Sequence, residues 1–189
     1  MSELMPGYKS GFVSIVGKPN AGKSTLTNRL LGQPVAGVSA KPQTTRKRQL
    51  AILTTDEAQI IFVDTPGLHE PKDKLSQFIN SEAQYALHDA DLILFLADSS
   101  QRPDKLDEGL AALVQEVQRD IPVLLVLNKN DLADSRTLAA NKALFENLLP
   151  GARAVSISAQ TGNGIENLLR VVRELLPEGP QYYPPDQIT

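Results

Sequence analysis

The stretch "GKPNAGKS" (residues 17–24) lies between a short apolar run, "FVSIV" (12–16), and the leucine-bearing stretch "TLTNRLL" (25–31). Its spacing matches G-x-x-x-x-G-K-[S/T], a glycine-rich loop whose backbone N–H groups surround phosphates. In such a loop Lys23 reaches the terminal phosphates and Ser24 reaches a magnesium ion. The alternative is a glycine turn that only caps a helix. Because a strand-like run precedes the stretch and a helix-like one follows it, the sequence favours the phosphate-binding loop.

Length and composition limit the classes of protein to consider. The chain has 189 residues, which suits one domain with a sizeable core. Its 19 basic and 22 acidic residues give a net charge of −3, so a nucleic-acid or membrane partner would need a local basic patch. With no cysteine, disulfides, thiol catalysis and cysteine-ligated zinc are excluded. The N-terminus has no apolar signal-peptide core and no apolar run reaches the ~20 residues of a membrane span, so we expect a cytoplasmic protein.

Short apolar runs alternate with amphipathic stretches along the chain. The runs are near-continuous rather than alternating, as in parallel strands that are covered on both faces. They are residues 12–16, 58–63, 91–97, 121–127 and 154–157. Apolar residues at helical spacing between 106 and 117, and again between 165 and 176, predict helices that cover the sheet.

The stretch "QLAILTTDEAQIIFV" (49–63) contains two strand-like runs separated only by "TTDE". This separation is too short for a helical crossover and predicts an antiparallel hairpin. We therefore expect an α/β fold of the P-loop NTPase type. The expected architecture is a three-layer sandwich with a mostly parallel six-stranded sheet, one antiparallel edge strand and helices on both faces.

Two further motifs follow predicted strands. "DTPG" (64–67) comes directly after "IIFV", where Asp64 can face the phosphate site and hold magnesium, and where Gly67 leaves a backbone N–H open to the γ-phosphate. "NKND" (128–131) ends the run "VLLVL", and the Asp131 carboxylate can accept hydrogen bonds from N1–H and the exocyclic amine of guanine. Taken alone, each motif is an ordinary turn. Their positions after strands favour the binding of a guanine nucleotide.

Two residues of "NKND" and one later stretch can also contribute to binding of the base. The stem of Lys129 can lie on the base face, and Asn128 can tie this loop to the phosphate loop. "SAQ" (158–160) follows the last predicted strand and can offer backbone N–H groups to guanine O6, although the tripeptide alone carries almost no information.

The ordered set "GKPNAGKS", "PQTTR", "DTPG", "NKND" and "SAQTG" resembles the five motifs of translation-factor-class GTPases, over about residues 10–178. The longer stretches "GKPNAGKSTLTNRLLGQ", "SAKPQTTRKR", "VDTPGLH" and "LPEGPQYYPPDQIT" resemble the Era family of bacterial ribosome-assembly GTPases. Related tRNA-modification and tandem GTPases share part of this pattern. The resemblance implies a GTPase domain at 10–178, preceded by an arm at 1–9 and followed by a linker that starts at 179.

The resemblance also assigns roles. Catalytic roles fall to Lys23, Thr45, Gly67 and Asn20, with Asn20 as a potassium ligand; a turn-stabilising role for Asn20 is the alternative. Magnesium ligands are Ser24, Thr45 and Asp64, with Thr44 as the alternative to Thr45. The expected nucleotide-binding residues are Gly17, Lys18, Pro19, Asn20, Ala21, Gly22, Lys23, Ser24, Thr25, Asp64, Thr65, Pro66, Gly67, Asn128, Lys129, Asp131, Ser158, Ala159 and Gln160.

Three features of residues 41–69, the region that contains "PQTTR" and "DTPG", bear on catalysis and on RNA binding. The residue after Gly67 is Leu68, where Ras-like enzymes hold a water-orienting glutamine, so another group must assist hydrolysis. His69 has no visible partner and fits a surface role better than catalysis. Four cations (Lys41, Arg46, Lys47 and Arg48) fit a solvated switch better than a dedicated RNA contact.

The resemblance implies GTP and GDP as ligands, Mg²⁺ and K⁺ as cations, and the small ribosomal subunit with its rRNA as partner. The implied role is in small-subunit assembly and 16S rRNA maturation. RNA binding would belong to a KH domain absent from this chain, because "PEGPQYYPPDQIT" reads as the start of a linker. A monomer is expected, and the resemblance leaves open peripheral contact with the inner membrane. The competing interpretations are a nucleotide-sensing assembly module with negligible unstimulated hydrolysis, and a P-loop kinase, which would leave "NKND" unexplained.

Overall fold

The computed structural model describes residues 5–32, 37–43, 48–64, 87, 89–117 and 120–184. Side chains are described for these residues except 37–43, 48–50, 64 and 117. The expected site residues Thr45, Thr65, Pro66 and Gly67 therefore lie outside the described residues, and of Asp64 only the backbone is described.

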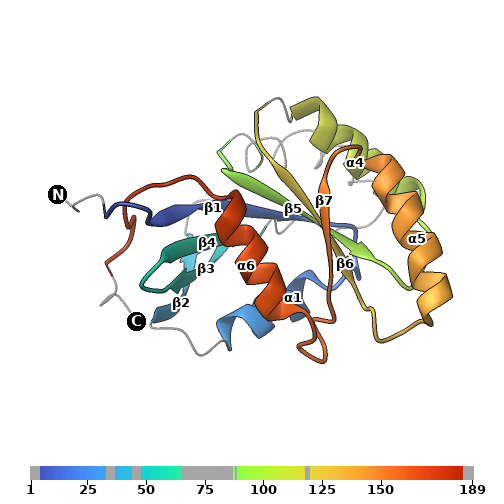
Figure 1. Cartoon of the computed structure of the whole chain (residues 1–189), viewed down its shortest axis with the longest axis horizontal. Helices are drawn as coiled ribbons and strands as arrows, with labels where there is room; N and C mark the ends of the chain where they lie inside the picture. Colours follow the sequence, from blue (N-terminus) through green and yellow to red (C-terminus); the bar gives the residue numbers. More distant parts are fainter. Residues whose placement is uncertain are drawn as a thin grey trace.

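The described elements include the strands and helices that the sequence predicts, together with β2 and α5, which it does not (Figure 1). In order they are β1 (Lys9–Val16), α1 (Lys23–Leu31), β2 (Gly37–Gln43), β3 (Arg48–Thr54), β4 (Ala58–Asp64), β5 (Leu92–Asp98), α4 (Lys105–Val117), β6 (Val123–Asn128), α5 (Ser135–Leu148), β7 (Arg153–Ser156) and α6 (Ile165–Leu175).

The strands form one sheet in the order β2-β3-β4-β1-β5-β6-β7. β1 pairs in parallel with β4 and β5, β6 pairs in parallel with β5 and β7, and β3 runs antiparallel to both of its neighbours. The mostly parallel sheet and the antiparallel hairpin at 49–63 are thus confirmed.

The sheet has one strand beyond the six expected, since β2 pairs outside β3 and makes β3 the second strand from the edge. The sequence of β2, "GVSAKPQ", lacks the apolar run by which the other strands were found. An edge strand pairs through its backbone on one side only, and Lys41 and Pro42 are residue types that edge strands tolerate.

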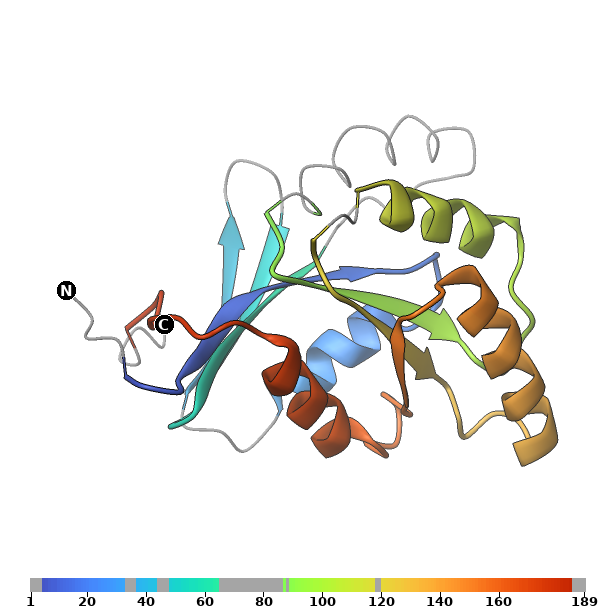
Figure 2. The same ribbon diagram turned by 45° about the horizontal axis from the view of Figure 1, so that its top comes forward.

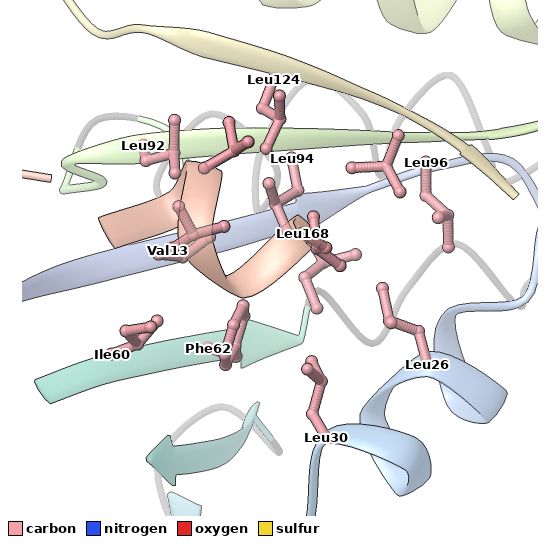
Figure 3. Close-up of a cluster of buried hydrophobic side chains, with 14 of the residues drawn as sticks. Val13, Leu26, Leu30, Ile60, Phe62, Leu92, Leu94, Leu96, Leu124 and Leu168 are labelled. Carbon is pink, nitrogen blue, oxygen red and sulfur yellow. The ribbon is translucent and has the colours of Figure 1, made fainter. Parts of the chain in front are cut away.

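Helices cover both faces of the sheet (Figure 2). α1 and α6 contribute to one apolar cluster, and α4 and α5 contribute to the other. In the first cluster Leu26 and Leu30 of α1 and Leu168 of α6 meet side chains from β1, β4 and β5 (Figure 3). Every residue of β5 and of β6 is buried, as their continuous apolar runs predict.

α5 was not anticipated from the sequence, and its burial pattern explains why. Of its residues only Asn141 and Phe145 are buried, so a repeating apolar stripe is missing. The local signal is its start, where the Asp134 side chain accepts a hydrogen bond from the Thr137 backbone N–H at 2.8 Å.

The segment after α6, predicted to begin a linker, is hydrogen-bonded to the sheet as far as Tyr183. The fully buried Gln59 of β4 donates to the Tyr183 carbonyl at 2.8 Å and accepts from the N–H groups of Tyr182 and Tyr183 at 2.8 and 3.1 Å. The rings of Phe12 and Tyr182 lie 5.3 Å apart. The first residues of the predicted linker are therefore anchored to β4 and β1.

Among the described helices, none has the combination of length and apolar character that a membrane crossing requires.

Candidate nucleotide-binding site

The loop at 17–22 joins the end of β1 to the start of α1, and its two outer positions require glycine. A β-carbon on Gly17 would lie 2.7 Å from the Leu96 carbonyl oxygen. Gly22 has φ 106°, a conformation that side chains disfavour, and it directly precedes α1. No side chain of the described residues caps α1, and its first turn has no acidic residue. The backbone N–H groups and the positive end of the helix dipole therefore suit an anion at this loop.

The predicted phosphate and magnesium residues of this loop lie at the start of α1. Lys23 is 3% exposed, whereas the side chain of Ser24 is exposed and that of Thr25 is half-buried. Asp64 is the last residue of β4 and pairs with Ile15 of β1, two residues before Gly17. The sheet therefore places the backbone of Asp64 and the phosphate loop at the same end of the parallel strands. The described residues contain no group of three or more His, Cys, Asp or Glu that could hold a metal.

Asn128 joins three loops at the end of β6. Its side-chain N–H donates to the Ala21 carbonyl at 2.9 Å, and its side-chain oxygen accepts from the Ala159 N–H at 2.9 Å. The side chain is 2% exposed. The predicted tie between Asn128 and the phosphate loop is present, and the same amide also holds the 158–160 loop.

Asp131 is positioned by the side chain of Ser158, a residue for which the sequence predicts only a backbone contact to the base. The hydroxyl of the fully buried Ser158 donates to Asp131 at 2.8 Å. Asp131 itself is exposed. Because a carboxylate can accept about four hydrogen bonds, it retains acceptor capacity for a base. The N–H groups of Ser158 and Ala159, expected to face guanine O6, donate in this structure to Asn163 and Asn128.

Lys129 bridges the base loop and the phosphate loop. Its ammonium donates to the Asn20 carbonyl at 2.6 Å and to the Asp98 carboxylate at 3.2 Å. Both Asn20 and Lys129 have positive φ, 69° and 65°. Asp98 ends β5 next to Asn128 in register, and it is a site residue that the sequence analysis missed because no motif surrounds it.

Lys18 belongs to the loop by sequence, but its ammonium is directed to α4. It lies 3.0 Å from carboxylate oxygens of both Asp104 and Asp107, and the Asp107 side chain is fully buried. Burial alone would lower the pKa of Lys18, but its hydrogen bonds to Asp107 and Asp104 and their charges raise it. The contacts described for Lys18 thus hold the loop against α4.

The comparisons with known proteins agree with this geometry. The model of a family described as 50S ribosome-binding GTPase matches residues 12–129. The chain belongs to this GTPase family. The match includes the phosphate loop, Asp64 and Asn128, and it ends two residues before Asp131.

Relatives of this family resemble the chain over nearly its whole length. GTPase Era of Lactobacillus delbrueckii subsp. bulgaricus is 44% identical over 182 residues, which cover 96% of this chain and 60% of that protein. A structure of Aquifex aeolicus Era bound to GDP·AlF₄⁻ has a TM-score of 0.77 at 38% identity, over 96% of this chain and 62% of that one.

A third relative was solved with RNA. The structure of Era in complex with MgGDPNP and nucleotides 1506–1542 of 16S ribosomal RNA has a TM-score of 0.78 at 38% identity, over 96% of this chain and 61% of that one. This chain spans about 60% of the length of the curated relatives it matches.

Proposed function

We propose that this chain binds GTP and GDP with Mg²⁺, hydrolyses GTP, and acts as the nucleotide switch of an Era-like protein in small ribosomal subunit assembly. The observation that carries the proposal is the pair Asp131 and Ser158. A carboxylate held in place beside two loops that Asn128 connects is a fixed acceptor for the N1–H and exocyclic amine of guanine, whereas adenine offers neither donor there. An acceptor that is left without a donor when the wrong base binds costs about 1–3 kcal/mol of binding free energy, which supports selection of guanine.

Mg²⁺ is the proposed cation because Ser24 lies at the start of α1 and the backbone of Asp64 ends β4 beside β1, at the end of the sheet where the phosphate loop begins. Ser24 and Asp64 would hold it, together with Thr45. When bound, the ion neutralises charge on the β- and γ-phosphates. The chain's own contribution is the glycine-shaped loop, the N-terminus of α1 and the Lys23 ammonium, which together position the γ-phosphate for attack by water.

A cation is proposed to assist hydrolysis because Leu68 cannot polarise water. The amide oxygen of Asn20 suits a hard monovalent ion such as K⁺. Asn20 lies within the phosphate loop, where it is exposed and has φ 69°, and this position supports the role.

The RNA partner is inferred from the relatives. The family description names the 50S subunit, whereas the Era structure at 38% identity holds 16S rRNA. Because the Era structure matches more of this chain, the small subunit is the proposed partner. Because the net charge of this chain is −3, we propose that the principal RNA contact belongs to a KH domain in the part of such proteins that this chain does not span. The cytoplasm, where ribosomes assemble, is the proposed location.

The experiment that tests the proposal combines binding and turnover. Competition titrations should show strong preference for GTP and GDP over ATP and ADP, and multiple-turnover phosphate release should require Mg²⁺. Lys23→Ala, which removes the phosphate-loop ammonium, is the control for loss of activity. Equal affinity for GTP and ATP would overturn the proposed base recognition.

Ribosomal subunits decide between the two remaining interpretations. An enzyme releases phosphate repeatedly without them, whereas a sensing module does so only in their presence. Co-sedimentation of the chain with 30S and with 50S subunits tests the choice of partner. Full affinity of this chain for the 30S subunit would show that the GTPase domain itself is the RNA reader.

A further inference from the structure

Arg29, in the last turn of α1, contacts the loop that carries Ser158. Its Nε donates to the Ala159 carbonyl at 3.0 Å and its Nη2 donates to the Gln160 carbonyl at 2.6 Å. α1 and the loop that leads into α6 lie side by side, although they are 130 residues apart in the chain (Figure 1). A planar guanidinium that holds two successive carbonyls fixes the orientation of two peptide groups.

The orientation of these carbonyls determines where the loop's N–H groups point. In a trans peptide the carbonyl and the following N–H point in opposite directions. With its carbonyl turned to Arg29, the Ala159–Gln160 peptide directs the Gln160 N–H away from the guanidinium. The Gln160–Thr161 peptide directs the Thr161 N–H away from it, and this N–H donates to the Ser158 hydroxyl oxygen at 3.1 Å.

The Ser158 hydroxyl both accepts and donates a hydrogen bond. Its oxygen accepts from the Thr161 N–H, and its single hydrogen is donated to Asp131 at 2.8 Å, since an ionised carboxylate can only accept. A continuous chain of contacts therefore runs from Arg29 through the Gln160–Thr161 peptide and Ser158 to the Asp131 carboxylate.

We infer that Arg29 is a positioning residue for base selectivity: from the helix of the phosphate loop, it sets the orientation of the carboxylate that recognises guanine. The inference rests on the proposed function, since it assumes that Asp131 meets the base. It adds that guanine selectivity depends on a side chain that touches neither the base nor Asp131. If Arg29 only stabilised the fold, its substitution would lower stability but would leave the ratio of affinities for different bases unchanged.

The test compares GDP with inosine diphosphate, which lacks the exocyclic amine and so loses one of the two hydrogen bonds to Asp131. For Arg29→Ala we expect GDP affinity to fall about tenfold, while inosine diphosphate loses less, because a misoriented carboxylate mainly forfeits the two-bond contact. Arg29→Lys should restore part of the GDP preference. Hydrolysis of bound GTP under single-turnover conditions should stay within about twofold of the original protein, since a hydrogen bond remote from the phosphates contributes little there.

Arg170→Ala is the matched control, because Arg170 is an exposed arginine of α6 that bonds Glu174 and Asn167. It should leave both affinities unchanged. Thermal unfolding without nucleotide checks that each variant is folded. If Arg29→Ala does not fold, the two affinities are compared in Arg29→Lys instead.

An unchanged ratio of the two affinities in the folded Arg29 variants would overturn the inference. If the original chain does not prefer GDP to ADP, the proposed function fails instead. The two failures are therefore distinguishable.

Discussion

The side-chain amide of Asn128 occupies the space that a β-carbon at Gly22 would need. The same amide nitrogen donates to Ala21. Gly22→Ala should therefore displace Asn128 and strain a φ of 106°, at a cost of about 1–3 kcal/mol. We expect GDP affinity to fall at least about tenfold, since the phosphate and base loops lose their common tie. Isothermal titration with GDP measures the effect.

Gly109→Ala is the control for this substitution. Gly109 lies within α4, and nothing lies within 4 Å of the added β-carbon. Alanine should stabilise the fold by about 0.5–1 kcal/mol and leave GDP affinity unchanged. Equal effects of the two substitutions on GDP binding would contradict the role given to Gly22.

The parts of the fold predicted from the sequence are those in which one local pattern decides the structure. β5 and β6 were found because their apolar runs are buried on both faces, and the loop at 17–22 because glycine is required by backbone geometry. β2 was missed because an edge strand such as "GVSAKPQ" pairs through its backbone. α5 was missed because a largely exposed helix needs no apolar stripe.

In the candidate site, the sequence predicts the residues that belong to motifs but not the residues that hydrogen-bond to them and hold their loops in place. Asn128 and Asp131 have motif spacing, whereas Asp98, Asp107 and Arg29 act through contacts with residues 31 to 130 positions away. No local pattern encodes such pairs, because they form only when the sheet brings the ends of separate elements together.

The choice of base can be inverted at Asp131. In Asp131→Asn an amide replaces the acceptor, and its N–H can donate to the C2 oxygen of xanthine. We expect a weaker affinity for GDP and a stronger one for xanthosine diphosphate, measured by competition. A variant that still preferred GDP would remove Asp131 from the contact with the base.

The ion pairs of Lys18 should matter for stability. Lys18→Met leaves the buried Asp107 without its cation, so we expect the free energy of unfolding in urea to fall by about 3 kcal/mol. Arg173→Ala is the comparison, because Arg173 pairs with a largely exposed Glu57 and should cost less than about 1 kcal/mol. Similar losses for both variants would show that the Lys18 pairs contribute no more than a surface pair.

Potassium dependence tests the role of Asn20. Multiple-turnover hydrolysis should be faster in KCl than in NaCl at equal ionic strength, and Asn20→Ala should abolish the difference. Asn167→Ala, on the exposed side of α6, should retain it. Equal hydrolysis rates of the unsubstituted chain in KCl and NaCl would exclude this role of Asn20. They would favour an arginine supplied by a partner as the group that assists hydrolysis.

The start of α5 gives a pH-dependent contribution to stability. The hydrogen bond from the Thr137 N–H holds the pKa of Asp134 below its ordinary value of 3.8. A carboxylate with a lowered pKa stabilises the folded state above its unfolded-state pKa, and this stabilisation is lost as the pH falls through the lower, folded-state pKa. Asp134→Ala should therefore lower the thermal midpoint clearly at pH 7 and progressively less below pH 3.8. Asp134→Asn, a neutral cap, should keep most of the midpoint at pH 7. A difference between the original chain and Asp134→Ala that stayed constant across this range would mean that the ionised carboxylate contributes nothing to the cap.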